Sequence, residues 1–114
     1  MFSYRVLIYK TEGGDEMAIS KGQVQFDLGV IRYARMYLKP SERDCDPLFM
    51  EKAAKYDLAA HYILNADMRA VYRALYQEPN RYKSAWVIAE DLYMSRKTLW
   101  RWKGKLIEYF AQVI

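Results

Sequence analysis

A chain of 114 residues, 53% of them apolar and 28% charged, is long enough for one folded domain with a modest core. No run approaches the roughly 20 apolar residues that a membrane span needs, and no secretory signal pattern is present, so we expect a soluble protein without either. The single Cys45 cannot form a disulfide within the chain, which fits a reducing cytoplasm.

The charge is divided unevenly along the chain. Residues 1–64 hold nine Lys/Arg and nine Asp/Glu, whereas residues 65–114 hold nine Lys/Arg and five Asp/Glu, so the whole excess of +4 lies in the second half. The run Met94 to Lys105 contains five basic residues and no acid. Such a patch attracts polyanions, although a solvated helix face has the same composition.

The first 16 residues predict a short strand or an extension. The run F-S-Y-R-V-L-I-Y is rich in β-branched and aromatic residues and is ended by Gly13 and Gly14. The codons for Glu12 and Gly13 can spell a ribosome-binding sequence a few codons before Met17, so we expect that Met17 is the natural start.

Residues 24–64 predict helices. Val24 to Leu38 follow helical spacing and stop before Pro40, and residues 41–46 read as a loop. Asp46 followed by Pro47 predicts a capped helix start. The buried stripe of that helix is expected to be Leu48, Phe49, Ala53, Tyr56, Ala60 and Ile63.

Residues 65–114 predict a helix-turn-helix region. One helix is expected over residues 67–77, a short one over residues 84–92 capped by Ser84, and a last one beginning at Ser95. The inner residues are expected to be Met68, Val71, Tyr72 and Leu75 in the first helix and Trp86, Val87, Ala89 and Leu92 in the second. A short helix, a tight turn and a capped basic helix are typical of this motif.

The last helix can be divided into two faces at about 100° per residue. The core face is expected to hold Leu99, Trp102, Leu106, Phe110 and Val113, with Tyr109 beside it. The opposite face holds Lys97, Trp100, Arg101, Gly104 and Glu108; Arg96 and Lys105 lie on its flanks, and Lys103 lies nearer the core edge. Because Trp100 lies away from the predicted core, we expect it to contact DNA or a protein partner.

The stretch from Met68 onward, with I-A-E-D-L, a turn and S-R-K-T-L, resembles the C-terminal helix-turn-helix of phage transcriptional activators of the RinA and ArpU type. It is also similar to region 4 of sigma factors. The resemblance covers about two fifths of the chain and implies a core of Ile88, Ala89, Leu92, Leu99 and Trp102. It implies Ser95 as the cap and Arg96, Lys97, Trp100 and Arg101 toward DNA. Residues 1–64 carry no such resemblance.

The composition does not favour an enzyme. One histidine, His61, and one cysteine are too few for the usual nucleophilic and metal sites, and the adjacent Asp44, Cys45 and Asp46 read as solvated loop residues. The Gly13-Gly14 pair lacks the Lys-Ser/Thr ending of a phosphate-binding loop. We therefore expect no catalysis, no bound metal and no cofactor.

Three functions fit these patterns. The first is a phage transcriptional regulator in the bacterial host cytoplasm that binds double-stranded DNA through Ser95, Arg96, Lys97, Trp100, Arg101, Lys103 and Lys105. Its other expected partners are host RNA polymerase, contacted by the N-terminal helices, and a second copy in a homodimer. The second is a DNA-packaging protein of the small-terminase kind. The third is a small phage protein that blocks a host factor by binding its acidic surface.

Overall fold

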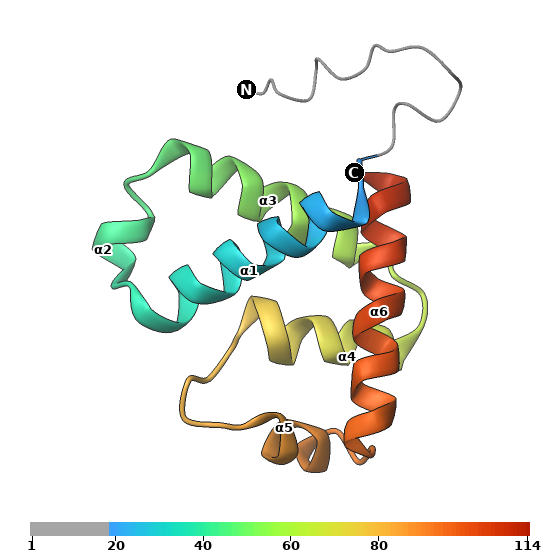
Figure 1. Ribbon diagram of the computed structural model, residues 1–114. Coiled ribbons are helices and arrows are strands. Elements are labelled where there is room, and N and C mark those ends of the chain that lie inside the picture. Colours follow the sequence, from blue (N-terminus) through green and yellow to red (C-terminus); the bar gives the residue numbers. More distant parts are fainter. Residues whose placement is uncertain (1–18) are drawn as a thin grey trace.

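The computed structural model describes residues 19–114, and this part of the chain is helical with no strand (Figure 1). The elements are α1 (Lys21–Tyr37), α2 (Pro40–Arg43), α3 (Pro47–His61), α4 (Ala66–Tyr72), the π-helix η3 (Arg73–Gln77), α5 (Ala85–Asp91) and α6 (Arg96–Val113). The prediction of a mainly helical domain is confirmed. The predicted N-terminal strand and the proposed start at Met17 lie outside the described residues.

Side-chain caps fix the beginnings of the helices. The carboxylate of Asp46 accepts the backbone N–H of Leu48 at 3.0 Å, and Pro47 occupies the first turn of α3, as predicted. Asn65, Ser84 and Ser95 cap α4, α5 and α6 in the same way. Short polar residues before apolar periodicity are therefore enough to place these starts.

Two boundaries differ from the predictions. Helix α1 begins one turn earlier than residue 24, because the Ser20 hydroxyl caps a polar first turn that carries no apolar signal. The predicted loop over residues 41–46 contains the single turn α2, in which the Glu42 carboxylate accepts the backbone N–H of Lys39 at 2.9 Å and Pro40 sets the first turn.

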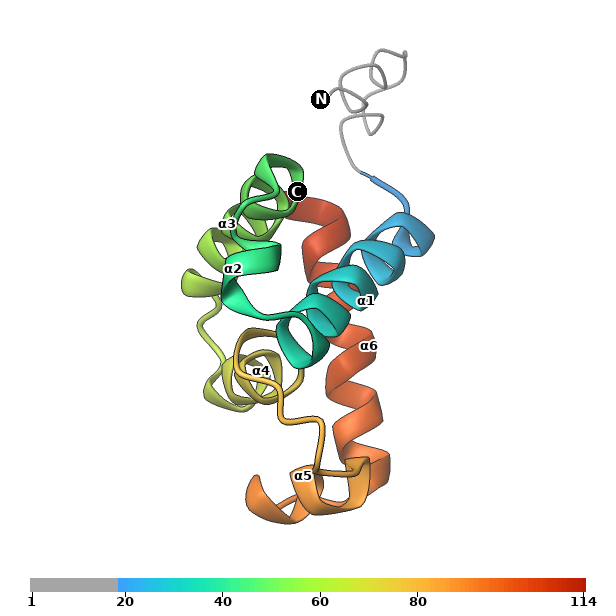
Figure 2. The same ribbon diagram turned by 90° about the vertical axis from the view of Figure 1, so that its left-hand side faces the viewer.

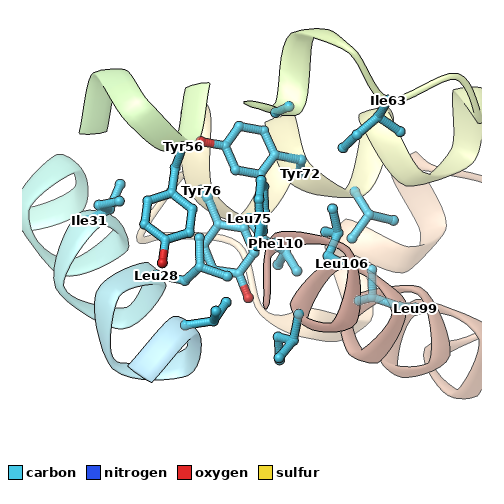
Figure 3. Close-up of a cluster of buried hydrophobic side chains, with 14 of the residues drawn as sticks. Leu28, Ile31, Tyr56, Ile63, Tyr72, Leu75, Tyr76, Leu99, Leu106 and Phe110 are labelled. Carbon is cyan, nitrogen blue, oxygen red and sulfur yellow. The ribbon is translucent and has the colours of Figure 1, made fainter. Parts of the chain in front are cut away.

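The core is shared by both halves of the chain. Helices α1 and α3 run side by side with α2 at the corner, while α6 crosses α1, α3 and α4 (Figures 1 and 2). Figure 3 shows aromatic and aliphatic side chains from these elements meeting in one cluster. Its largest fully buried members are Tyr56, Tyr72, Phe110, Leu28, Ile31, Leu99 and Leu106.

The predicted buried residues are mostly confirmed. Ala53, Tyr56, Ala60 and Ile63 are buried along α3, as are Val71, Tyr72 and Leu75 further on, while Phe49 and Met68 are partly buried against the core. Four predictions were wrong, because these apolar side chains are exposed: Leu48, Trp86, Val87 and Val113. Leu48 lies in the first turn of α3 and is 65% exposed.

The predicted helix over residues 67–77 changes its geometry at Arg73. Its last five residues form a π-helix, in which the N–H of Glu78 bonds to the carbonyl of Arg73 at 2.7 Å. The guanidinium of Arg35 donates to the carbonyl of Tyr76 at 2.8 Å, so α1 satisfies an acceptor at the end of this segment.

Two polar networks join α1 to α3. Asp27 is buried and accepts from Lys52 at 2.7 Å, Tyr56 at 2.8 Å and Gln23 at 2.8 Å. Arg35 forms two hydrogen bonds to Asp57, at 2.8 and 3.3 Å. These side chains fix α1 against α3, and buried charges need such partners.

The buried phenol of Tyr76 makes stability sensitive to alkali. Burial raises its pKa to about 12, above the usual value of about 10. The unfolded chain therefore loses this proton first as the pH rises. The contribution of this phenol to the free energy of unfolding is fully present below pH 10 and is lost between about pH 10 and 12.

We expect urea midpoints to fall steeply from about pH 10 upward, and to fall less for Tyr76→Phe. Burial also raises the pKa of Tyr72, whose hydroxyl donates to Asp57, so the variant keeps part of the slope. Tyr93→Phe, which removes an exposed phenol, serves as the control. Equal slopes for Tyr76→Phe and the wild type would contradict the expectation.

Candidate nucleic-acid interface

Helices α5 and α6 form a helix-turn-helix. Figure 2 shows α5 lying across the N-terminal end of α6, with the short turn of residues 92–95 between them. The apolar side of α5 is formed by Ile88 and Ala89, which are buried, with Ala85 and Leu92 packed against the core. This packing presents the beginning of α6 at one end of the domain.

The turn is closed by backbone hydrogen bonds. The N–H of Tyr93 bonds to the carbonyl of Glu90, and the N–H of Met94 bonds to the carbonyl of Ala89, both at 3.0 Å. This pattern requires a left-handed residue after the helix, and Tyr93 adopts it with φ 58°. Glycine is the usual residue there, because side chains strain this conformation.

Tyr93→Gly should raise the free energy of unfolding by about 0.5 to 1 kcal/mol, because it removes this strain, partly offset by the entropy of the unfolded chain. The side chain is 97% exposed and makes no packing contribution that would be lost. Urea denaturation measures the change, with Tyr93→Ala as the control that keeps a Cβ. A loss of stability for Tyr93→Gly would show that the turn is not strained.

The N-terminus of α6 is capped and carries no acid. The Ser95 hydroxyl accepts the N–H of Thr98 at 3.1 Å and lies 3.0 Å from the Thr98 hydroxyl. Its first turn contains Arg96 and Lys97 and no acidic residue. The helix dipole adds partial positive charge at the same end, so the potential there favours anions.

The exposed surface of α6 is basic, with Arg96 in its first turn beside α5 and Lys97, Arg101 and Lys105 along its outer face. Arg96, Lys97, Arg101 and Lys105 are exposed. Within residues 19–114, none of the four takes part in an ion pair. The acid on this helix, Glu108, lies 3.6 Å from Lys21 of α1 instead. Within the described part of the chain, no carboxylate therefore neutralises these four charges.

Trp86 is a second exposed tryptophan beside the start of α6, and the sequence analysis did not place it there. It was assigned to packing, but 57% of it is exposed and the Arg96 guanidinium lies 4.5 Å from its ring centroid. The signal was present, because Ala85, Ile88, Ala89 and Leu92 alone complete a helical stripe and place Trp86 outside it. The stacked pair forms a flat cationic surface beside the start of α6.

Trp100 and Lys103 lie on the side of α6 toward α1. Ile107 is buried, so the core face extends further in this direction than predicted, and Trp100 lies at its edge instead of opposite it. Trp100 is 48% exposed, and the Lys103 ammonium lies 4.6 Å from its ring centroid. Burial, and then the charge of Arg32, lower the pKa of Lys103.

These two residues border a hollow of about 270 Å³ between α1, η3, α5 and α6. Trp100 therefore lines this hollow and is also partly exposed to solvent. The exposed part of Trp100 can still contact a partner, but the side chain projects less into solvent than its predicted position opposite the core implies.

The seven predicted interface residues thus form two groups. Ser95, Arg96, Lys97, Arg101 and Lys105 lie at the N-terminus and along the outer face of α6, and Trp100 and Lys103 lie on its flank. Among residues 19–114 no group of three His, Cys, Asp or Glu could hold a metal ion, and no helix is long and apolar enough to cross a membrane.

Searches against protein-family models, curated proteins and solved structures find no match for this chain.

Proposed function

We propose that the chain is a sequence-specific double-stranded DNA-binding protein, a phage transcriptional regulator that activates late or packaging genes in the cytoplasm of a bacterial host. The observation that carries the proposal is the basic surface of α6: Arg96 at its start and Lys97, Arg101 and Lys105 on its outer face are exposed and form no ion pair within residues 19–114. A helix held to the domain by its apolar side and basic at its start suits the major groove.

The two kinds of contact would divide along α6. Lys97 and Lys105 would neutralise phosphates, which position the protein but carry no sequence information. Arg101 projects from the middle of the outer face, where a guanidinium can donate two hydrogen bonds to a guanine edge. The stacked Arg96 and Trp86 would contact the backbone or a sugar beside the groove.

Gly104 supports a close approach on this face. A Cβ at this position would meet no atom within 4 Å among the described residues, so their packing does not require glycine there. Glycine inside a helix costs about 0.5 to 1 kcal/mol relative to alanine. A DNA backbone passing close to α6 would account for its presence.

Footprinting on the genome that encodes the chain tests the proposal. We expect a small number of protected duplex sites near promoters, lost when Arg101 is replaced by alanine. Transcription from these promoters in the presence of host RNA polymerase separates a regulator from a packaging protein. No binding to any duplex at low salt would overturn the proposal and favour a protein that binds an acidic host surface.

The N-terminal helices are the proposed contact with RNA polymerase. They lie away from the start of α6, so a polymerase subunit could reach them while α6 contacts DNA (Figure 1). A bacterial pull-down of polymerase that persists after Arg101→Ala would separate this contact from DNA binding.

A further inference from the structure

Helix α1 has a second apolar face that is largely exposed within residues 19–114, although the Arg81 guanidinium lies 5.7 Å from the ring centroid of Tyr37 at its C-terminal end. Its core side holds Val24, Leu28 and Ile31, which are buried. The opposite side holds what we call the α1 outer stripe: Phe26, Gly29, Val30, Tyr33 and Tyr37. A helix on the surface of a domain normally has one apolar side, and within residues 19–114 no apolar element packs on this stripe.

The stripe has the spacing of a helix-pairing seam. Phe26, Val30, Tyr33 and Tyr37 follow one another at intervals of four, three and four residues, which is the alternation that lets two helices pack along their length. Core packing of α1 does not explain this second period, because the buried residues are on the other side of the helix.

A hollow lies beside the stripe. It has a volume of about 440 Å³ between α1, α2 and the start of α3, and its lining is mostly apolar, including Ala34, Leu38 and Phe49. Phe26 and Tyr33 border it and remain 64% and 58% exposed. The same surface thus carries projecting aromatic rings and a recess that can receive one.

We propose that the α1 outer stripe is the interface of a homodimer, in which two copies of α1 pack antiparallel across a two-fold axis. In this arrangement Phe26 of each copy lies beside Tyr37 of the other, and Val30 beside Tyr33. Each ring from one copy reaches the recess of the other, since an isologous interface uses the same patch twice.

The charges favour a second copy over a charged partner. The charged residues of α1 are Lys21, Asp27, Arg32 and Arg35, and none lies on the outer stripe. A partner chosen by its charge would be drawn to α6 instead. Two stripes without charged residues can meet along α1 without repulsion, although each copy carries a net charge of +4 and Glu42, Arg43 and Asp46 line the hollow beside the stripe.

The area is sufficient for a modest dimer. Aromatic side chains bury about 150 to 250 Å² each, and Phe26, Tyr33 and Tyr37 have 64%, 58% and 48% of their surface exposed. With Val30 and Leu38, this gives on the order of 500 Å² per copy and on the order of 1,000 Å² in total, the lower limit of specific interfaces. We therefore expect a reversible dimer at micromolar concentrations.

Gly29 lies in the middle of the stripe and supports the close approach of a second helix. A Cβ there would meet no atom of residues 19–114 within 4 Å. The fold of one copy therefore does not require glycine, whereas two helices that pack at short distance do benefit from it.

Sedimentation equilibrium on the full chain, over about 1 to 500 µM, tests the proposal. The wild type should show a monomer–dimer equilibrium, and Tyr33→Glu should raise the dissociation constant at least about 100-fold, because it places a charge in an apolar interface. Tyr62→Glu is the matched control, since Tyr62 is 68% exposed at the end of α3. It should keep the wild-type constant.

Phe26→Ser is a milder change and should raise the dissociation constant at least about tenfold. It replaces Tyr33→Glu in the test if circular dichroism shows that Tyr33→Glu does not fold. A protein that is monomeric at every concentration would overturn the proposal. An outer stripe covered by residues 1–18 would give this same result. A dimer that Tyr33→Glu and Phe26→Ser leave intact would overturn it as well. The measurement contains no DNA, so its outcome is separate from that of the proposed function.

Discussion

Replacing Leu99 with alanine should lower the free energy of unfolding by about 2 to 5 kcal/mol. Leu99 is fully buried, and Figure 3 shows it on the side of α6 that carries Leu106 and Phe110. The substitution removes apolar contacts and leaves a cavity that the surrounding helices fill only in part. Urea denaturation followed by circular dichroism measures the loss.

Val113→Ala is the matched control on the same helix. The sequence analysis placed Val113 on the core face with Leu99, but the structure leaves it 51% exposed. Its replacement should cost less than about 0.5 kcal/mol. Trp102→Ala should cost an intermediate amount, because Trp102 is only partly buried against the core. Equal losses of unfolding free energy for Leu99→Ala and Val113→Ala would mean that the buried side of α6 is wrongly assigned.

The sequence predicts the helices well because their signals are local. Asp46-Pro47, Asn65, Ser84 and Ser95 each stand directly before a helix, and capping depends on groups within three residues. The single turn at Pro40–Arg43 was not predicted, because a proline followed by three polar residues shows no apolar periodicity. Its start depends on the Glu42 carboxylate, a signal that is also common in loops.

Which side of each helix is buried is harder to predict, because it depends on which other helices pack against it. Ile107 of α6 is buried because α1 packs against that side, a contact between segments about 80 residues apart. The same contact places Trp100 at the edge of the core. In α5, Trp86 and Val87 were assigned to the core for their apolar character alone, although the stripe of Ile88 and Ala89 excludes them.

The π-helix and the polar networks could not be predicted from one sequence. The widened turn at Arg73–Gln77 places the carbonyl of Tyr76 where Arg35 can donate to it, and both residues come from distant segments. The buried Asp27 is another example, because its partners Lys52 and Tyr56 lie on α3. Because its side chain is charged, the sequence alone would place Asp27 on the surface of α1.

The basic run was predicted as an exposed face, and the positions of Lys97, Arg101 and Lys105 agree with that prediction. Exposure by itself does not distinguish a DNA contact from a solvated helix. The distinction lies in how binding responds to salt, because phosphate contacts release counterions and other surfaces do not.

Removing both Lys97 and Arg101 should therefore weaken binding to a specific duplex and flatten its salt dependence. Each phosphate contact contributes about 0.9 to the slope of log affinity against log salt, so the double alanine variant should lose up to about 1.8. If Arg101 reads a guanine instead, Arg101→Ala alone should lose about 1 to 3 kcal/mol on the specific site and much less on random DNA.

Fluorescence anisotropy from about 50 to 300 mM salt, on specific and random duplexes, measures both effects. Lys39→Ala is the matched control, because it removes the same charge at the start of α2, away from α6 (Figure 1). It should keep the wild-type slope, and circular dichroism should show all variants folded, since Lys97 and Arg101 are exposed. If the double variant binds as the wild type does at every salt concentration, the outer face of α6 does not contact DNA. The basic residues would then serve solubility or an acidic protein partner.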